Sequence, residues 1–230
     1  MSSWWSNNKD NASMIAALKK NRVCKSETVE RAMLKVDRKN YAPHSPYRDT
    51  PVSIGYGATI SAPHMHACAL ELLKNHLTEG AIALDVGSGS GYLCSCMAHM
   101  VGETGKVYGI EHIPELVDMS IRNLKKDNPE LLEFERVKII NGDGRKGYEE
   151  GAPYDAIHVG AAAPSVPESL IEQLKPGGRM VIPVGGARWS QVIKLIDKDS
   201  DGKVTSKDMM DVMFVALTDR HRQCSGSSSR

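Results

Sequence analysis

The chain has 230 residues, of which 41% are hydrophobic and 25% charged, and 29 basic against 28 acidic side chains leave a net charge of +1. This length suits one large domain with a real core, and the near-neutral balance argues against a dedicated nucleic-acid or acidic-membrane partner. No apolar run approaches the ~20 residues that span a bilayer, and the five cysteines form no Cys-x-x-Cys pair, so we expect reduced thiols in a cytoplasmic protein.

The N-terminal part of the chain is predicted to be helical around one irregular segment. Apolar residues recur with helical spacing over 12–18 and 28–36. Residues 41–63 are rich in proline and have no period, and an irregular stretch of this length is usually functional. Ser61-Ala62-Pro63 then predicts the start of a helix over about 64–76, with the serine as its cap and the proline in its first turn.

From residue 81 onward the pattern alternates between strands and helices. Such alternation predicts an α/β fold, a doubly wound parallel sheet with helices on both faces. Strands are expected at 81–86, 106–111, 136–141, 154–160 and 179–184, and helices at 91–101, 114–127 and 166–174. Two further strands are expected in the tail, at 191–196 and 209–217.

We predict a single domain over 1–230. Residues 1–80 would supply the N-terminal helices and the active-site loop, and residues 81–223 the cofactor-binding core and a closing tail. The Ser/Gly-rich end, 224–230, is expected to be disordered.

The most informative motif is the glycine-rich turn after the first of these core strands. In Gly87-Ser88-Gly89-Ser90-Gly91 the spacing is G-x-G-x-G, which is not the dinucleotide fingerprint, and no lysine is present for a phosphate-binding loop. Asp85, Glu111 and Asp143 make the surroundings acidic, which repels a pyrophosphate and attracts a cation. Glu111 ends the next strand, where an acidic side chain suits the two hydroxyls of a ribose. The loop therefore indicates a site for S-adenosylmethionine, although an ordinary strand–helix turn is the alternative.

Five segments together resemble the protein L-isoaspartate (D-aspartate) O-methyltransferase family. They are Ala-Thr-Ile-Ser-Ala-Pro-His-Met-His at 58–66, Leu-Asp-Val-Gly-Ser-Gly-Ser-Gly at 84–91, Gly-Asp-Gly at 142–144, Tyr-Asp-Ala-Ile-His-Val-Gly at 154–160 and Leu-Lys-Pro-Gly-Gly at 174–178. The glycine loop alone marks the broad methyltransferase class, whereas 58–66 is far more specific because it lies outside the shared cofactor fold. The resemblance covers roughly 12–223 and is strongest to the animal cytosolic type.

The resemblance implies a Rossmann-like methyltransferase sheet with an N-terminal helical region, extra C-terminal strands in an altered order, and a tail that closes over the site. It implies S-adenosyl-L-methionine as cofactor and S-adenosyl-L-homocysteine as product. The implied partners are isoaspartyl-containing proteins and peptides, whose α-carboxylate is methylated so that the ester collapses to a succinimide and part of it returns to normal aspartate. We expect a protein-repair enzyme that is a cytosolic monomer without a nucleic-acid or membrane partner.

Ser61 is the expected catalytic residue, in agreement with the family's active-site serine. Its hydroxyl, and free N–H groups at the start of the following helix, can orient a carboxylate. A carboxylate is already ionised at pH 7, so the site needs no general base and must hold it in line while excluding water. The alternative is that Ser61 only caps the helix.

The expected cofactor-binding residues are Ala58, Thr59, Ile60, Ser61, His66, Asp85, Gly87, Ser88, Gly89, Ser90, Glu111, His112, Asp143, Gly144, Thr218 and Gln223. The resemblance places His66 against the cofactor and closes Thr218 and Gln223 over it. Asp143 is expected to accept from the adenine amino group, with a turn aspartate as the alternative. Asp85 is expected to order the glycine loop by accepting backbone N–H bonds.

No metal site is expected. Residues 197–208 fit the Asp-x-Asp-x-Asp-Gly pattern of a calcium EF-hand loop, but the twelfth position is Asp208 rather than glutamate. The flanks are β-branched or alternating, which predicts a hairpin with an Asp-Gly turn. His64 and His66 lack a third ligand at a suitable spacing.

Repair methylation has two alternatives. A small-molecule O- or N-methyltransferase is disfavoured by the 58–66 segment. A non-catalytic cofactor-binding adaptor is disfavoured by the presence of Ser61, Asp85 and Glu111. The glycine spacing argues against a dehydrogenase.

Overall fold

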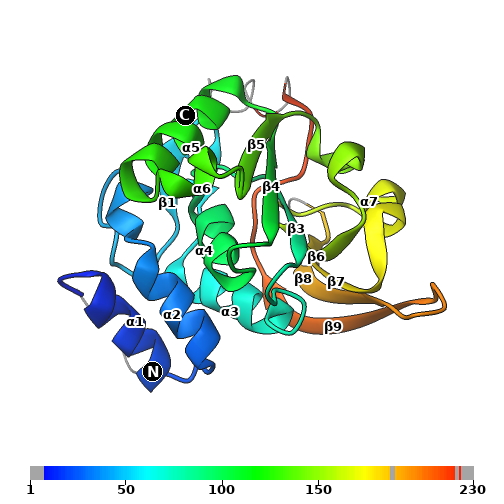
Figure 1. The fold of residues 1–230 in the computed structure, drawn as a ribbon, viewed down its shortest axis with the longest axis horizontal. Helices are drawn as coiled ribbons and strands as arrows, with labels where there is room; N and C mark the ends of the chain where they lie inside the picture. The colour runs from blue at the N-terminus through cyan, green and yellow to red at the C-terminus, as the bar shows by residue number, and fades with distance from the viewer. Residues whose placement is uncertain (1–7, 187–189, 221–222, 224–230) are drawn as a thin grey trace.

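Figure 1 shows the computed structural model of the chain, which describes residues 8–186, 190–220 and 223. A seven-stranded sheet of order β5-β4-β3-β6-β7-β8-β9 runs through its centre. The strands are β3 (Ile82–Val86), β4 (Lys106–Glu111), β5 (Val137–Asn141), β6 (Tyr154–Val159), β7 (Leu174–Val184), β8 (Gln191–Lys198) and β9 (Val204–Val212). The first five of these pair in parallel, and β8 and β9 are antiparallel. The predicted α/β sheet with extra C-terminal strands is therefore confirmed.

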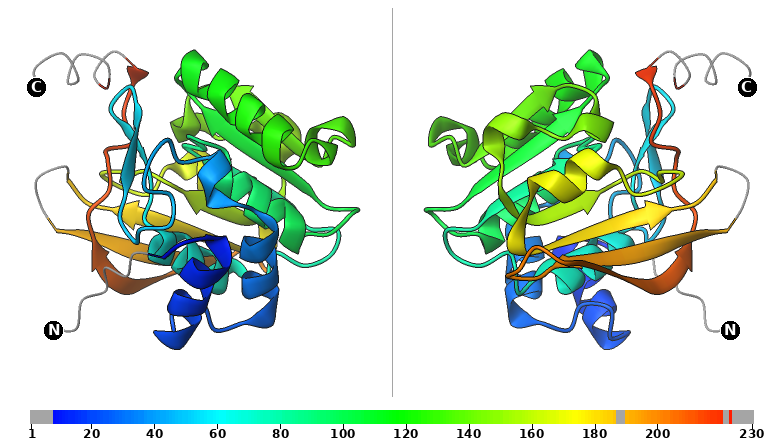
Figure 2. Two further views of the ribbon diagram at one scale, coloured as in Figure 1. Left: turned by 90° about the vertical axis from the view of Figure 1, so that its left-hand side faces the viewer. Right: turned by 90° about the vertical axis from the view of Figure 1, so that its right-hand side faces the viewer.

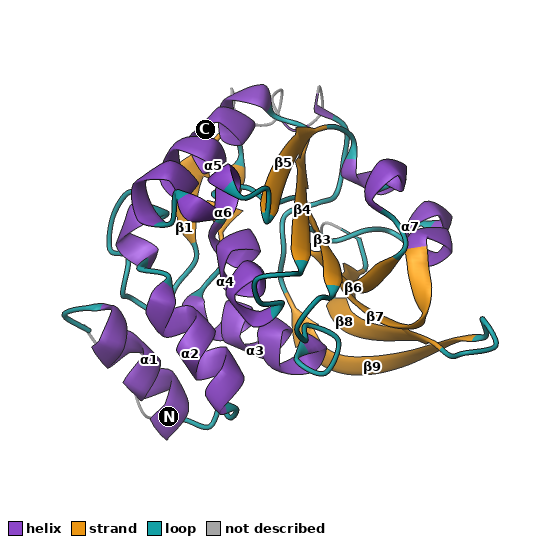
Figure 3. Cartoon of the chain, viewed as in Figure 1, coloured by secondary structure: helices purple, strands orange, loops and turns teal. Residues whose placement is uncertain are grey.

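Helices cover both faces of this sheet (Figure 3). They are α4 (Tyr92–Met100), α5 (Pro114–Asp127), α6 (Glu130–Glu133) and α7 (Glu168–Gln173), with short 3₁₀ helices η2 (Gly144–Lys146) and η3 (Glu149–Gly151). Figure 1 shows α7 on the opposite face from α4 and α5. One apolar cluster, with Met97 and Leu116, lies on the α4 side, and a second, with Ile157 and Leu170, lies on the α7 side. No described helix has the length and apolar character needed to cross a membrane.

The N-terminal region forms α1 (Asn11–Lys20), α2 (Glu27–Lys35) and α3 (Pro63–Leu73). Asp10 starts α1 with a capping box, because its side chain accepts from the N–H of Ser13 while the Ser13 hydroxyl accepts from the N–H of Asp10. The start of α2 is held by Glu71 of α3, whose carboxylate accepts from the Ser26 N–H at 2.6 Å and from the Ser26 hydroxyl at 2.7 Å. These bonds fix α2 against α3.

Residues 41–63 are more ordered than predicted. The 3₁₀ helix η1 (Arg38–Asn40) precedes them, and β1 (Val52–Gly55) pairs with β2 (Ala58–Ile60) as an antiparallel hairpin. The strands have four and three residues, too few to show an alternating pattern in the sequence. In both views of Figure 2 this hairpin lies beside the tail that follows β9.

The tail hairpin is confirmed, but its second strand was misplaced. β9 ends at Val212, so the predicted strand over 209–217 is wrong beyond that point. Most residues of β9 are exposed. The strand therefore lacks the alternation of buried apolar and exposed polar residues by which a strand is predicted from sequence. Asp199 accepts from the N–H groups of Asp201 and Lys203 and so forms the turn, while Asp208 pairs with Lys194 at 2.5 Å. The predicted disorder of 224–230 lies outside the described residues.

Candidate active site

A cleft lies at the carboxyl ends of β3, β4 and β6. The chain travels outward from β3 through β4 to β5 and then returns to place β6 on the other side of β3. Such a reversal is where open α/β sheets bind ligands. The cleft consists of two adjoining pockets that share Thr59, Gly87, Gly89 and Gly160.

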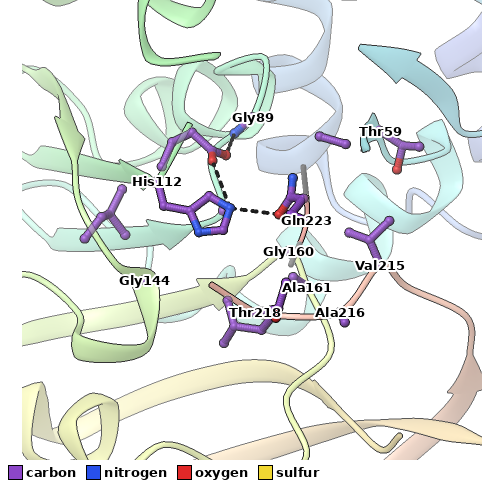
Figure 4. Close-up of a pocket in the computed structure, with 15 residues that line it drawn as sticks. Thr59, Gly89, His112, Gly144, Gly160, Ala161, Val215, Ala216, Thr218 and Gln223 are labelled. Carbon is purple, nitrogen blue, oxygen red and sulfur yellow. Dashed lines mark hydrogen bonds and ion pairs between the residues drawn. The ribbon is translucent and has the colours of Figure 1, made fainter. Parts of the chain in front are cut away.

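We call the first the glutamate pocket (Figure 4); it is lined by Ala58, Thr59, Gly87, Gly89, Ile110, Glu111, His112, Gly144, Gly160, Ala161, Val215, Ala216, Leu217, Thr218 and Gln223. The second, the aspartate pocket, is lined by Thr59, Ile60, Ser61, His66, Asp85, Gly87, Ser88, Gly89, Ser90, Tyr92, Leu93, His158 and Gly160. The structure thus brings every predicted cofactor-binding residue except Asp143 to one of the two pockets.

The glycine loop is shaped to admit a ligand close to its backbone. Gly87 and Gly89 have φ of 75° and 51°, in the left-handed region that favours glycine. A Cβ on Gly87 would meet no atom within 4 Å, because that side of the residue faces the cleft. Between them, the Ser88 hydroxyl is buried without a hydrogen-bond partner among the described residues. An unpaired buried hydroxyl at the wall of a pocket fits a polar ligand.

Glu111 lies where β4 ends and is only 6% exposed. Its carboxylate accepts from the N–H of Gly89 at 3.2 Å and from the N–H of Ile113 at 3.0 Å, so it ties the glycine loop to the start of α5. Burial raises the pKa of this carboxyl, while the two backbone bonds and His112 act in the opposite direction. The lone pairs left over can accept from ligand hydroxyls in the glutamate pocket.

Residues of the C-terminal tail line the glutamate pocket. The amide oxygen of Gln223 lies 2.8 Å from Nε2 of His112, and its amide nitrogen donates to the carbonyl of Tyr56 at 3.0 Å. Figure 4 shows Gln223 and His112 meeting across the pocket, with Thr218 on the same segment of chain. Gln223 therefore connects the tail both to the end of β4 and to the turn of the β1–β2 hairpin.

Asp85 is oriented differently from the prediction. Instead of accepting loop N–H bonds, its Oδ1 lies 2.7 Å from Nδ1 of His158, and its Oδ2 accepts from the Cys94 thiol at 3.2 Å. Asp85 is 2% exposed and His158 is 8% exposed. His158 was not predicted as a site residue, although it lies one strand away in direct register with Asp85. Only the register of β3 against β6, which the sequence does not show, places His158 beside Asp85.

Asp143 does not line either pocket. Its carboxylate caps the 3₁₀ helix η2 through the N–H of Arg145 and also forms a 2.7 Å ion pair with the guanidinium of the same residue. This ion pair is the principal reason that the pKa of Asp143 is lowered. The turn-aspartate alternative describes its geometry, and the neighbouring Gly144 lines the pocket instead.

Ser61 is not the cap of α3, contrary to the prediction. The N-cap residue is Ala62, and no side chain caps the helix. The expected free N–H groups are also not available, because Pro63 has none and Asp49 accepts from the N–H of His64 at 2.9 Å. The Ser61 hydroxyl itself makes no hydrogen bond with any described residue.

An outer groove of about 540 Å³ opens beside the aspartate pocket. It is lined by Pro51, Thr59, Ser61, Ala62, His64, Met65, Asp211, Val212, Met213, Phe214 and Val215. Ser61 and Thr59 belong to both cavities. Ser61 therefore lies where the aspartate pocket meets the outer groove, whose volume is large enough for a peptide segment.

Comparison with known proteins agrees with this architecture. The sequence model of the Protein-L-isoaspartate(D-aspartate) O-methyltransferase family matches residues 8–222. A Caenorhabditis elegans protein-L-isoaspartate O-methyltransferase is 53% identical over 220 residues, which cover 96% of this chain and 97% of the relative. Protein-L-isoaspartate O-methyltransferase 1 of Arabidopsis thaliana is 51% identical over 220 residues, with 94% of each chain covered.

A solved structure has the same fold. It is a protein-L-isoaspartate O-methyltransferase from Plasmodium falciparum in complex with S-adenosyl-L-homocysteine, with a TM-score of 0.85 and 40% identity. The match covers 91% of this chain and 99% of that chain. Together with the family match, these similarities establish that the chain belongs to the protein-L-isoaspartate(D-aspartate) O-methyltransferase family.

Proposed function

We propose that this chain transfers a methyl group from S-adenosylmethionine to the α-carboxylate of L-isoaspartyl residues, and to the side-chain carboxylate of D-aspartyl residues, in damaged proteins and peptides. The observation that carries the proposal is the position of Ser61, at the junction of the aspartate pocket and the outer groove. A methyltransferase needs such a junction, because the methyl donor and the polypeptide approach from different sides. Family membership supports the substrate, and the relative solved with S-adenosylhomocysteine supports the cofactor.

The two pockets fit the methyl donor. S-adenosylmethionine supplies the methyl group and a good leaving group at its sulfonium. Glu111 would accept from the ribose hydroxyls, and the unpartnered Ser88 hydroxyl would bond a polar group of the donor. The negative charge of Asp85 in the aspartate pocket favours a cationic donor over a phosphate-bearing one. Gly144, Thr218 and Gln223 would enclose the adenosine end.

The substrate carboxylate would be the nucleophile. It is ionised near neutral pH, so the protein's task is to orient it and to keep water out. The Ser61 hydroxyl is free to donate a hydrogen bond to it. The substrate backbone would lie in the outer groove between α3 and the 211–215 segment. An isoaspartyl residue displaces its carboxylate by one methylene, so a groove that fixes the backbone can select it over aspartate.

We also propose that the chain acts as one domain and as a cytosolic monomer, with isoaspartyl proteins as its partners. Cys24, Cys68, Cys94 and Cys96 are free thiols, which agrees with a reducing compartment. The N-terminal helices contribute α3, and hence His66, to the cleft of the α/β core. The two parts therefore build one site together.

The products of the reaction test this function. After methylation, the following backbone amide nitrogen attacks the ester carbonyl, methanol leaves and a succinimide forms. We expect mass spectrometry to find the ester on the isoaspartyl residue, followed by succinimide and a growing fraction of normal aspartyl peptide. An ester on any other carboxylate, or no ester at all, would contradict the proposal.

A further inference from the structure

Arg38 is a fully buried cation directly behind the active site. It belongs to η1, and its relative exposure is 0%. Its Nη2 donates to the carbonyl of Ser61 at 2.8 Å, and its Nη1 lies 3.2 Å from Nδ1 of His66. No carboxylate among the described residues pairs with it, and its Nε has no partner there. A buried charge whose hydrogen-bond partners are all neutral is costly and calls for a reason beyond packing, even with the more distant carboxylate of Asp49 acting on it.

The contact with Arg38 determines which nitrogen of His66 carries the proton. A guanidinium has five donors and no acceptor. Nδ1 of His66 must therefore accept, which places the ring proton of the neutral imidazole on Nε2. No described residue forms a hydrogen bond with Nε2, and this atom is not fully buried. The His66 ring lines the aspartate pocket. The ring is thus a hydrogen-bond donor at the cleft.

We propose that Arg38 is a positioning residue of the methyl-transfer site. Through Nη1 it holds His66 as the neutral tautomer that donates from Nε2, and through Nη2 it fixes the backbone of Ser61. One side chain thereby sets two donors, the His66 ring and the Ser61 hydroxyl, that line the same pocket. Both donors suit a carboxylate, either of the amino-acid end of the methyl donor or of the substrate. This inference rests on the proposed function.

The titratable groups around His66 come from several elements. Arg38 faces it from η1, His64 lies on its own helix α3, and Tyr92 of α4 packs with a ring-centroid distance of 4.9 Å. His158 of β6 and Asp85 of β3 share the aspartate pocket with it.

The pKa values of His66 and Arg38 agree with a neutral imidazole beside a charged guanidinium. Burial first, then the charges of Arg38, His158 and His64, hold the pKa of His66 well below its usual value. Burial lowers the pKa of Arg38 to about 10, so the guanidinium stays charged near neutral pH. His66 therefore remains a neutral donor across the physiological range.

Nitrogen-15 NMR of the histidine-labelled wild-type protein tests the proposal directly. The His66 ring, assigned by loss of its signal in His66→Gln, should show a proton on Nε2 and no titration from pH 8 down to pH 6. A proton on Nδ1, or a doubly protonated ring at pH 7, overturns the proposal. Because this measurement needs no turnover, its failure is distinct from failure of the wild-type protein to methylate an isoaspartyl peptide.

Variants then separate positioning from packing. In Arg38→Met we expect the His66 pKa to rise, the tautomers to mix, and kcat/KM for an isoaspartyl peptide to fall at least tenfold, with a new loss of rate toward acid pH. Arg38→Lys should restore part of the rate. Arg136→Met is the matched control, because Arg136 also donates to backbone carbonyls, that of Ala98 within α4 and that of Gly102 beyond its end. It should lower stability and leave the pH profile unchanged.

Substitutions that move the hydrogen-bond-donating nitrogen give a second test at His66 itself. The amide nitrogen of glutamine replaces Nε2 of histidine, whereas that of asparagine replaces Nδ1. We expect His66→Gln to retain at least tenfold more kcat/KM than His66→Asn. The opposite order, or an Arg38→Met protein with the wild-type pH profile and His66 tautomer, would overturn the role given to Arg38.

Discussion

Asp85 and His158 occupy directly paired positions on the parallel strands β3 and β6, and their side chains meet at 2.7 Å between Oδ1 and Nδ1. Both are almost fully buried, and both line the aspartate pocket. The pairing sets the direction of the carboxylate at the wall of the pocket. The aspartate pocket is therefore lined by a carboxylate whose orientation is fixed by the fold.

This relationship predicts how the cleft discriminates between donor and product. Asp85→Asn removes the charge with little change of shape. It should weaken binding of S-adenosylmethionine, which carries a sulfonium, more than binding of S-adenosylhomocysteine, which does not. Two charges ~10 Å apart at an effective dielectric constant of ~20 interact by about 1.7 kcal/mol, so we expect a shift of roughly tenfold in the ratio of the two Kd values.

Calorimetry with each ligand checks this. Cys94→Ser is the matched control, because the thiol donates to the same carboxylate and the change alters no charge. Equal weakening of both ligands by Asp85→Asn would show that its charge does not act on the sulfonium.

Ser61→Ala should affect turnover rather than stability. Since Ala62 is the N-cap of α3 and the Ser61 hydroxyl bonds no described residue, its removal breaks no hydrogen bond of the fold. Loss of one hydrogen bond to a charged substrate group costs about 1.5–3 kcal/mol, or roughly tenfold to a hundredfold in kcat/KM. Steady-state kinetics at saturating donor and a melting curve measure the two effects.

Ser26→Ala is the matched control for this serine. Its hydroxyl bonds Glu71 and receives a bond from Lys74, so the melting temperature should fall while kcat/KM is retained. If Ser61→Ala instead lowers the melting temperature and leaves kcat/KM at the wild-type value, the assigned role is wrong.

Glu111→Gln should weaken the binding of S-adenosylhomocysteine. The amide keeps the size of the side chain but can no longer accept at both of its terminal atoms, so one backbone N–H or ribose hydroxyl is left unpaired. An unsatisfied buried polar group costs about 1–3 kcal/mol, which calorimetry would register as a higher Kd. A wild-type Kd in a folded variant would refute the ribose assignment.

Stability should decline on the acid side of neutrality. Burial lowers the pKa values of His66, His76 and His99 below their usual value. As pH falls, the unfolded chain takes up protons first, so the stability that these neutral rings contribute is fully present above about pH 6.5 and is lost below it. His66, the buried ring of the three, can account for up to about 1.4 kcal/mol per pH unit, and the partly exposed His76 and His99 for less.

Denaturant unfolding at pH 7.5 and pH 5.5 measures this dependence. His66→Gln should reduce the difference in unfolding free energy between the two pH values, whereas the same change at the exposed His44 should not. Identical slopes in all three proteins would contradict the assignment of His66 as a buried neutral ring.

Local patterns made most of the α/β core predictable. The strand, glycine loop and helix around 81–101 carry their own periodicity and turn residues, and Glu111 follows from the spacing of the motif. What was missed has three different causes. The pairing of His158 with Asp85 joins residues far apart in the chain, which no local pattern records. The β1–β2 strands are too short to alternate visibly, and Arg145 lies close to Asp143 in the sequence but local pattern does not decide between it and a ligand.

The central claim concerns selection of the isoaspartyl linkage, and one comparison tests it most directly. Two peptides of identical composition, one with a single isoaspartyl residue and the other with normal aspartate, are incubated with the wild-type protein and labelled S-adenosylmethionine at the same pH. The account predicts methyl transfer to the isoaspartyl peptide, with background transfer to its twin. Equal kcat/KM for both peptides, or transfer to neither, would contradict it.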